Sequence, residues 1–335
     1  MMNKKAYEFS FSWFFAIIAG AVILFLALYA TTKLVGTYRL QQDTLRGKEI
    51  EVLLSPLETN LEGTRGVVIT VPQETRISNR CDENSKFGSQ YISASIKSSI
   101  GKEWEISPGA ESSTHNKYLF SAKTTEGKKE FYALSKQFGF PFKIADLIIV
   151  WSDKENYCFV SPPQEIEEDI KEITQDNIIK NLISVNSEAE CSQDSIKVCF
   201  RETGCGIDVS LGSKSVTKNG KTVYYAESFG KEEEKYSLLY ASIFSEQEIY
   251  ECQIKRLAKR ASEIASLNKE KSLYLTSKGC SSSPILPSAL TEYIAKTQLV
   301  ISAKNSLELK TQLNALGSSA DSLKNKNDQL RCRLF

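Results

Sequence analysis

Residues 9–32, FSFSWFFAIIAGAVILFLALYATT, form a run of twenty-four residues without a charged side chain. Lys4, Lys5 and Glu8 precede the run and Lys33 follows it. Because an α-helix rises about 1.5 Å per residue, about 20 apolar residues cross the hydrocarbon core of a bilayer. No other stretch of the sequence is as long and as apolar. The run therefore predicts a single transmembrane helix, with the lipid bilayer as a partner.

Two other interpretations of this run have to be compared with an anchor. A cleaved signal peptide has a shorter apolar core, about 7–15 residues, and small residues at its exit. Here the exit reads ALYA at 27–30, with Leu28 where a small residue is needed. A buried helix of a soluble domain is the second alternative, but such helices seldom run this long without a charge. The length favours a retained anchor.

The orientation of the anchor depends on two signals that disagree. The nearby basic residues lean slightly toward a cytoplasmic bulk; they are Lys4 and Lys5 before the helix, and Lys33, Arg39, Arg46 and Lys48 after it. However, all eight cysteines follow the helix and both methionines precede it, which suits an oxidising exterior. We therefore expect a single-pass cell-membrane protein with most of its chain extracytoplasmic. The cytoplasmic tail, residues 1–8, is too short for a signalling or catalytic domain.

The eight cysteines are candidates for disulfides, with reduced core cysteines as the alternative. They are Cys81, Cys158, Cys191, Cys199, Cys205, Cys252, Cys280 and Cys332. Eight cysteines allow 105 pairings, but three of them, at 191, 199 and 205, are close enough for one local bridge. The sequence has no C-x-x-C and one histidine, so we predict neither a metal site nor a cofactor. With 42 basic and 41 acidic residues, nucleic acid is not an expected partner.

The order of sequence patterns predicts an α+β fold with a membrane anchor. Helix formers continue past the bilayer to Ser55-Pro56, and Leu34, Tyr38, Gln41, Leu45 and Val52 lie on one helical face. The predicted parts are a cytoplasmic tail (1–8), a transmembrane helix (9–32), a stalk helix (33–55), a mixed, β-rich α+β ectodomain (66–244) and a C-terminal antiparallel helical hairpin (245–335).

Within the ectodomain, β-branched and aromatic residues between turn signals predict strands. These are 67–71, 90–96, 102–106, 117–122, 146–151, 157–160, 196–200 and 206–211. The apolar run at 146–151 predicts a central strand, which we expect to pair with 157–160 as a hairpin. Residues 164–183 predict a helix, and Asn219-Gly220 predicts a second hairpin. Residues 236–244 fit either a strand or the lead into the next helix.

Two long helices are predicted to close the chain, the second capped by Ser288 and continuous to its end. Its apolar residues step by four and three, which is a heptad seam. The seam consists of Leu309, Leu313, Leu316, Ala320, Leu323, Asn327 and Leu330. We expect it to close a hairpin within one chain, with an intermolecular coiled coil as the alternative. The polar Asn327 is the type of residue that sets register or oligomeric state.

No catalytic motif accompanies these elements, and we predict no small-molecule ligand. His115 stands in a loop-like segment without a nucleophile signature, so a surface histidine explains it better than a catalytic one. Glu167 and Glu168 lie on a predicted helix with lysines, which is an ordinary solvated face. Gly204-Cys205-Gly206 fits a tight turn beside a bridge. Carboxylate pairs of hydrolases leave no spacing signature, so a tethered hydrolase stays an alternative.

The ends of the chain carry two resemblances. Lys4-Lys5-Ala6 before Tyr7 is similar to the basic leader of type IV pilins, which implies cleavage after Ala6 and a place in a pilus-like or secretion assembly. Glu8 departs from that pattern, because pilins carry a glutamate at the fifth mature position. Residues 240–265, with a Cys-containing C-terminus, resemble uncharacterised single-pass surface proteins of small-genome archaea, which implies no function. We expect a structural or partner-binding role with other membrane or surface proteins, and no enzymatic activity.

Overall fold

The computed structural model describes residues 11–55, 57, 66–97, 104, 111–175, 179–201, 203–231, 234–279 and 285–335. The predicted tail (1–8) and the pilin-like cleavage point lie outside these residues, as does all but one residue of the strand predicted at 102–106.

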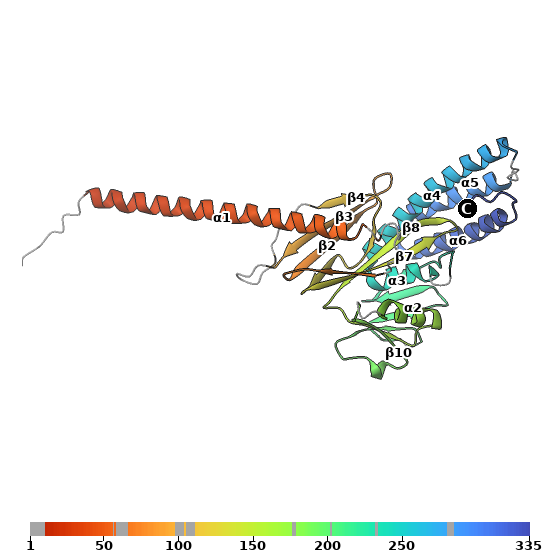
Figure 1. Cartoon of the computed structure of the whole chain (residues 1–335), viewed down its shortest axis with the longest axis horizontal. Helices are drawn as coiled ribbons and strands as arrows, with labels where there is room; N and C mark the ends of the chain where they lie inside the picture. Colours follow the sequence, from red (N-terminus) through yellow and green to blue (C-terminus); the bar gives the residue numbers. More distant parts are fainter. Residues whose placement is uncertain are drawn as a thin grey trace, which may run out of the picture.

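The predicted transmembrane segment and the predicted stalk form one helix, α1 (Phe11–Leu53), which leaves the rest of the molecule as a long rod (Figure 1). Its 43 residues include a segment long and apolar enough to cross a membrane. At about 1.5 Å per residue the helix is about 64 Å long, roughly twice the hydrocarbon thickness of a bilayer. The predicted continuation of the apolar helix into a stalk is confirmed.

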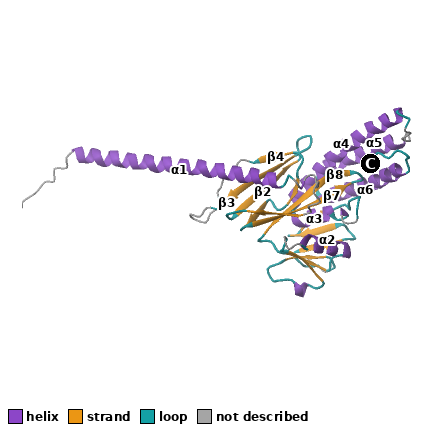
Figure 2. Cartoon of the chain, in the orientation of Figure 1, coloured by secondary structure: helices purple, strands orange, loops and turns teal. Residues whose placement is uncertain are grey.

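The chain folds into three β-sheets and a set of helices (Figure 2). The strands are β1 (Gly66–Thr70), β2 (Thr75–Asp82), β3 (Ser89–Ile96), β4 (Ser112–Thr114), β5 (Tyr118–Phe120), β6 (Thr124–Gly127), β7 (Glu130–Gly139), β8 (Lys143–Ser152), β9 (Tyr157–Val160), β10 (Leu182–Val185), β11 (Ile196–Cys199), β12 (Ile207–Ser210), β13 (Ser215–Lys218) and β14 (Lys221–Tyr224). The helices after α1 are α2 (Gln164–Thr174), α3 (Ser237–Phe244), α4 (Gln247–Ser277), α5 (Ile285–Ser302) and α6 (Ser306–Asp328). The predicted α+β class is confirmed.

The middle layer of the ectodomain is the four-stranded sheet β1-β7-β8-β5. In β8, Ile148 and Val150 belong to a core shared with the end of α1, whereas Ile149 and Trp151 belong to the larger core on the opposite side. Because successive side chains of a strand point to opposite faces, both faces of this sheet are covered. The prediction of a central strand at 146–151 is therefore confirmed.

The predicted hairpin between 146–151 and 157–160 is wrong. Strand β9 belongs to the six-stranded sheet β10-β9-β11-β12-β13-β14, where it runs parallel to β10 and β11. Parallel neighbours need a crossover, and α2 supplies it between β9 and β10. The predicted helix is consequently shorter, since it ends at Thr174 and its last apolar residues enter β10.

The hairpin predicted at Asn219-Gly220 is confirmed, because it joins β13 and β14 in antiparallel pairing. Both turn residues have positive φ, 51° for Asn219 and 70° for Gly220, as a type I′ turn requires. Two of the longer strands, β2 and β7, were not predicted from the sequence. Strand β7 is paired on both sides in the middle sheet.

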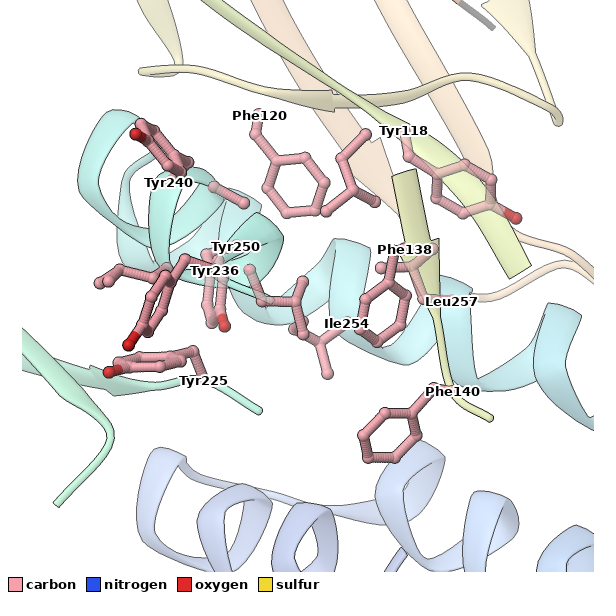
Figure 3. Close-up of a cluster of buried hydrophobic side chains, with 14 of the residues drawn as sticks. Tyr118, Phe120, Phe138, Phe140, Tyr225, Tyr236, Tyr240, Tyr250, Ile254 and Leu257 are labelled. Carbon is pink, nitrogen blue, oxygen red and sulfur yellow. The ribbon is translucent and has the colours of Figure 1, made fainter. Parts of the chain in front are cut away.

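The ambiguous segment 236–244 forms helix α3, whose eight residues are all buried. A segment buried on every side has no polar face, so its sequence lacks the periodicity that separates helix from strand. Tyr236, Tyr240 and Tyr250 gather around the helix beside Phe120 in the larger core (Figure 3). The helix thus fills the space between the middle sheet and α4.

The predicted helical hairpin is confirmed, with a correction to its second arm. Helices α4 and α5 pack together, and so do α5 and α6. The arm is not one continuous helix, because it breaks at 303–305, where the Asn305 side chain accepts a 2.9 Å hydrogen bond from the Glu308 N–H and caps α6. It also begins earlier than the predicted cap at Ser288, since α5 starts at Ile285.

Candidate functional site

The C-terminal half of α1 is packed against the folded domain through one face. Asp43, Gly47, Ile50 and Leu54 are buried on this face, at helical spacing. The carboxylate of Asp43 accepts a 3.1 Å hydrogen bond from the N–H of Ile96, at the end of β3. Ile50 and Leu54, each at most 2% exposed, enter the smaller core. The helix therefore meets the ectodomain through a packed junction.

Polar contacts close the end of this junction. The ammonium of Lys117, which is nearly buried, donates a 3.1 Å hydrogen bond to the Ser55 hydroxyl and lies 3.9 Å from the Glu51 carboxylate. Glu51 also accepts a hydrogen bond from the hydroxyl of Ser112 in β4. Residues of β3, β4 and the β4–β5 connection therefore all contact the C-terminal part of α1.

The apolar face that the sequence places on the stalk is not the face that packs. Leu34, Tyr38, Leu45 and Val52 are 71, 62, 59 and 67% exposed, and Gln41 is also exposed. At 100° per residue this face lies about 180° around the helix from the buried one. We call these five residues the stalk stripe.

Three disulfides are formed among the described residues, and no described cysteine is a free thiol. The pairs are Cys81–Cys252, Cys158–Cys191 and Cys199–Cys205. The last is a local bridge of the kind predicted, next to a turn in which the N–H groups of Gly204 and Cys205 donate to the Asp208 carboxylate. Cys280 lies outside the described residues.

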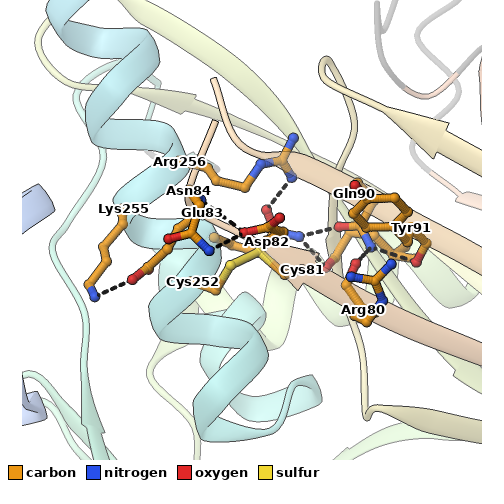
Figure 4. Close-up of a disulfide and its surroundings, with 12 residues drawn as sticks. Arg80, Cys81, Asp82, Glu83, Asn84, Gln90, Tyr91, Cys252, Lys255 and Arg256 are labelled. Atoms are coloured by element: carbon orange, nitrogen blue, oxygen red, sulfur yellow. Dashed lines mark hydrogen bonds and ion pairs between the residues drawn. A yellow bond between two sulfur atoms is a disulfide. The ribbon is translucent and has the colours of Figure 1, made fainter. Parts of the chain in front are cut away.

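The bridge between β2 and α4 lies among polar side chains, of which Gln90 and Arg256 are buried (Figure 4). Arg256, one turn beyond Cys252, is fully buried and donates to three backbone carbonyls. Those acceptors are the carbonyl oxygens of Lys117 at 2.9 Å, His115 at 3.0 Å and Phe87 at 3.3 Å. Burial lowers the pKa of Arg256 to about 10. This cluster fastens α4 to two loops, so its role is structural.

The seam residues of the last helix face the inside of the chain. Leu309, Leu313, Leu316, Ala320, Leu323 and Asn327 are buried, and Leu330 is partly buried. Asn327 makes two hydrogen bonds of 2.7 Å: its amide donates to the Phe335 oxygen, and its oxygen accepts from the Leu334 N–H. Its polar side chain therefore holds the C-terminal residues, a role that the heptad pattern did not suggest.

The free end of the α4–α5 hairpin carries large apolar side chains in solvent. They are Leu267, Leu273 and Tyr274 in α4, and Ile285 at the start of α5, between 56 and 64% exposed. The Lys278 ammonium lies 5.5 Å from the centre of the Tyr274 ring. Figure 1 places this end on the opposite side of the molecule from the start of α1. We call these four residues the hairpin tip.

A pocket of about 550 Å³ lies beside α3, between the six-stranded sheet and the start of α4. Lys218 donates hydrogen bonds of 3.0 and 2.8 Å to the carbonyls of Ser242 and Ile243 near the C-terminal end of α3. Desolvation lowers the pKa of Lys218 to about 8 and raises the pKa of Glu155, which lines the same pocket. Glu246 also lines it, but accepts a 3.0 Å hydrogen bond from the Lys123 N–H.

The remaining residues singled out in the sequence have local structural partners. His115 is exposed, and its Nδ1 donates a 2.8 Å hydrogen bond to the carbonyl of Gly88. Glu167 forms an exposed ion pair with Lys171 one turn along α2. Within the part of the chain that the structure describes, no three His, Cys, Asp or Glu side chains are grouped so as to hold a metal ion.

Comparison with known protein families, curated proteins and solved structures gives no significant match to this chain. The resemblances noted in the sequence therefore stay predictions, and the function has to be argued from the geometry.

Proposed function

We propose that this chain is a membrane-anchored, extracytoplasmic binding protein whose hairpin tip contacts another surface protein. The observation that carries the proposal is the placement of two features at opposite ends of one rigid molecule: the apolar part of α1 and the hairpin tip (Figure 1). An anchor at one end presents the tip to the exterior, at the greatest distance from the bilayer. The catalytic machinery of an enzyme is not needed for such a role.

The extracytoplasmic location is supported by the N-terminal apolar helix together with three disulfides. Disulfides persist in oxidising compartments and are rare in the cytosol, where thiol systems keep cysteines reduced. The bridge between Cys81 and Cys252 joins residues 171 positions apart and connects β2 with α4. Three bridges of different span favour a stable structural role over a transient redox one.

The chemistry of the hairpin tip indicates the partner. Single exposed apolar residues are common on protein surfaces, but Leu267 and Tyr274 are seven residues apart and thus share one helical face. Lys278, the C-cap of α4, adds a positive charge beside the ring of Tyr274, whereas Lys271 donates a 2.7 Å hydrogen bond to the carbonyl of Leu334. A partner with an apolar groove and an acidic rim would complement this surface.

The proposal is tested by photo-cross-linking of the full-length protein in native membranes, with the reactive group placed at Tyr274. We expect one heavier adduct that contains a second, extracytoplasmic protein. The matched control carries the group at Leu307, which is 64% exposed at the start of α6. Tyr274→Ser should remove the partner from the detergent-solubilised protein. If Tyr274 and Leu307 give the same adducts, or Tyr274 gives none, the tip is not the binding surface.

The anchor is tested separately. The full-length chain should remain in the membrane pellet after carbonate washing, and protease added to intact cells should degrade the ectodomain. Release by carbonate, or full protection from the protease, would contradict the proposed topology.

A hydrolase is the second candidate function, because Glu155, Glu246 and Glu248 line one pocket and the pKa of Glu155 is raised by burial, as a general acid requires. Hydrolysis of nitrophenyl glycosides or esters by the purified protein, lost in Glu155→Gln, would support it. Activity that is unchanged in this variant would place the chemistry elsewhere.

A further inference from the structure

The pocket beside α3 contains a partly buried lysine whose amine is held in one place. Lys218, the last residue of β13, donates hydrogen bonds of 3.0 Å to the Ser242 carbonyl and 2.8 Å to the Ile243 carbonyl. A lysine beside the last carbonyls of a helix acts as a C-terminal cap, and these two bonds have that effect on α3. The amine nitrogen has a third position besides its bond to carbon. Among the described residues, no hydrogen-bond partner takes that third position.

The walls of the pocket are apolar and their charges balance. Ile207, Val223, Ile243 and Phe244 line it, and each of these side chains is at most 5% exposed. The ionisable side chains of the lining are three carboxylates and three amines, those of Glu155, Glu246, Glu248, Lys197, Lys218 and Lys221. A balanced lining of this kind favours neither a free anion nor a free cation. The pocket therefore suits a small neutral molecule with an apolar body.

Three of these charged residues already have partners within the chain. The Lys197 ammonium lies 2.7 Å from the Glu188 carboxylate. Glu246 and Glu248 are exposed, and Lys123 contacts both of them. Its N–H donates a 3.0 Å hydrogen bond to Glu246, and its ammonium forms an ion pair with Glu248.

Glu155 is the carboxyl group that acts together with Lys218. One of its oxygens, Oε2, accepts hydrogen bonds of 3.0 Å from the N–H of Ser152 and 3.3 Å from its hydroxyl, which fix the carboxyl group at the pocket wall. The charge of Glu155 raises the pKa of Lys218, and the charge of Lys218 lowers the pKa of Glu155. An amine and a carboxyl group thus share one apolar pocket.

We propose that this pocket binds a small aldehyde or ketone covalently, as an imine of the Lys218 amine, with Glu155 as the acid that releases water. The inference goes beyond the contact proposed for the hairpin tip and does not depend on it. It shares Glu155 with the hydrolase alternative, but it requires neither an ester nor a glycoside.

The environment of Lys218 supplies the reactive form of the amine. Only a neutral amine attacks a carbonyl carbon, and desolvation lowers the pKa of Lys218 to about 8. At pH 7 about a tenth of the amine is then neutral, roughly 200-fold more than for an ordinary surface lysine. A neutral amine has two N–H groups and one lone pair. Because the carbonyls of Ser242 and Ile243 accept the two N–H groups, the lone pair is left for a ligand in the pocket.

The reaction conserves atoms and electrons without an oxidant or a reductant. The nitrogen lone pair forms a bond to the carbonyl carbon, and a proton passes from nitrogen to oxygen to give a carbinolamine. Glu155 then protonates the hydroxyl, the C–O bond breaks with release of water, and the nitrogen lone pair forms the C=N bond. The Glu155 carboxylate takes back a proton from the nitrogen. Desolvation raises the pKa of Glu155, which favours the protonated form that the second step needs.

The proposal is tested on the full-length protein in detergent with benzaldehyde and sodium cyanoborohydride at pH 7, which converts an imine into a stable secondary amine. Peptide mass spectrometry locates the adduct. We expect Lys218 to be labelled at least about ten-fold faster than Lys221. Lys221 is the matched control, because it lies in the same hairpin and lines the same pocket but is exposed. Equal rates at the two lysines, or no adduct at Lys218, would overturn the proposal.

The role of Glu155 is tested with Glu155→Gln and two reagents. Labelling of Lys218 by benzaldehyde should fall at least about ten-fold, because the carbinolamine loses water slowly without the acid. Acetylation of Lys218 by acetic anhydride expels acetate instead of water, so its rate should not fall in the same variant. Unchanged labelling by benzaldehyde, or an equal fall with both reagents, would show that Glu155 is not the acid.

Discussion

Replacement of Arg256 by methionine should cost the ectodomain about 2–6 kcal/mol. The guanidinium donates to the carbonyl oxygens of Phe87, His115 and Lys117. Three hydrogen bonds from a charged donor contribute about 1.5–3 kcal/mol each, so their loss alone would cost about 5–9 kcal/mol. Against this, methionine removes the cost of burying a charge, which the fall of the Arg256 pKa from 12.5 to about 10 sets at about 3 kcal/mol.

The assay is urea unfolding of the full-length protein in detergent, with its disulfides intact, followed by tryptophan fluorescence. Arg260→Met is the matched control, because Arg260 lies one turn further along α4 and donates a 2.7 Å hydrogen bond to the carbonyl of Ile144. We expect about 1 kcal/mol for the control. Arg256→Lys should recover less than half of the loss, since an ammonium cannot reach all three carbonyls. A loss at Arg256 no larger than at Arg260 would refute the reasoning.

The disulfide next to this cluster offers a further check. Cys81–Cys252 and Arg256 both hold α4 to the β2–β3 region, so their effects should not add. Combining Cys81→Ser/Cys252→Ser with Arg256→Met should cost less than the sum of the two changes. Simple additivity would show that the bridge and the arginine stabilise different units.

The remaining predictions concern a buried lysine and the last helix. Because the Lys218 pKa is about 8 in the folded chain and about 10.5 when unfolded, the unfolded chain binds more protons between these values, so stability should rise with pH there. The ammonium is partly solvated, so we expect on the order of 1–2 kcal/mol, absent in Lys218→Met, by urea titration at pH 7.5 and 9.5. Asn327→Leu leaves the Leu334 N–H unpaired, so it should destabilise by about 1–3 kcal/mol without changing the mass in light scattering; stabilisation would contradict the observed tail contact. Leu323→Ala empties a fully buried site and should lower stability by about 2–4 kcal/mol, whereas a cost below 1 kcal/mol would mean that the helix is not packed.

The candidate surfaces could be foreseen only in part. The apolar spacing of Leu34, Tyr38 and Leu45 was visible in the sequence, but a helical stripe has the same pattern whether it packs inward or stays exposed. The structure decides this, because the ectodomain occupies the opposite face through Asp43 and Ile50. The pocket beside α3 had no sequence signal, since Glu155 and Lys218 come from segments 63 positions apart.

Features that depend on neighbours along the chain were determined by the sequence itself. The uncharged run at 9–32 requires a long apolar helix, and Asn219-Gly220 requires a tight hairpin because both residues accept positive φ. The apolar run at 146–151 likewise requires a strand with two covered faces. In each case the free energy that selects the structure comes from local backbone preference or from continuous burial.

Features that depend on distant partners were decided by tertiary structure alone. Strand β9 pairs with β10 and β11 and not with β8, its neighbour along the chain. Cys81 pairs with Cys252, although eight cysteines allow 105 complete sets of disulfides. Asn327 likewise forms a hydrogen bond with the C-terminal end of the chain and not with a facing helix. These pairings depend on which surfaces the folded core brings together. Hydrogen bonds and burial between remote segments leave no periodic pattern in the sequence, so the sequence alone does not predict them.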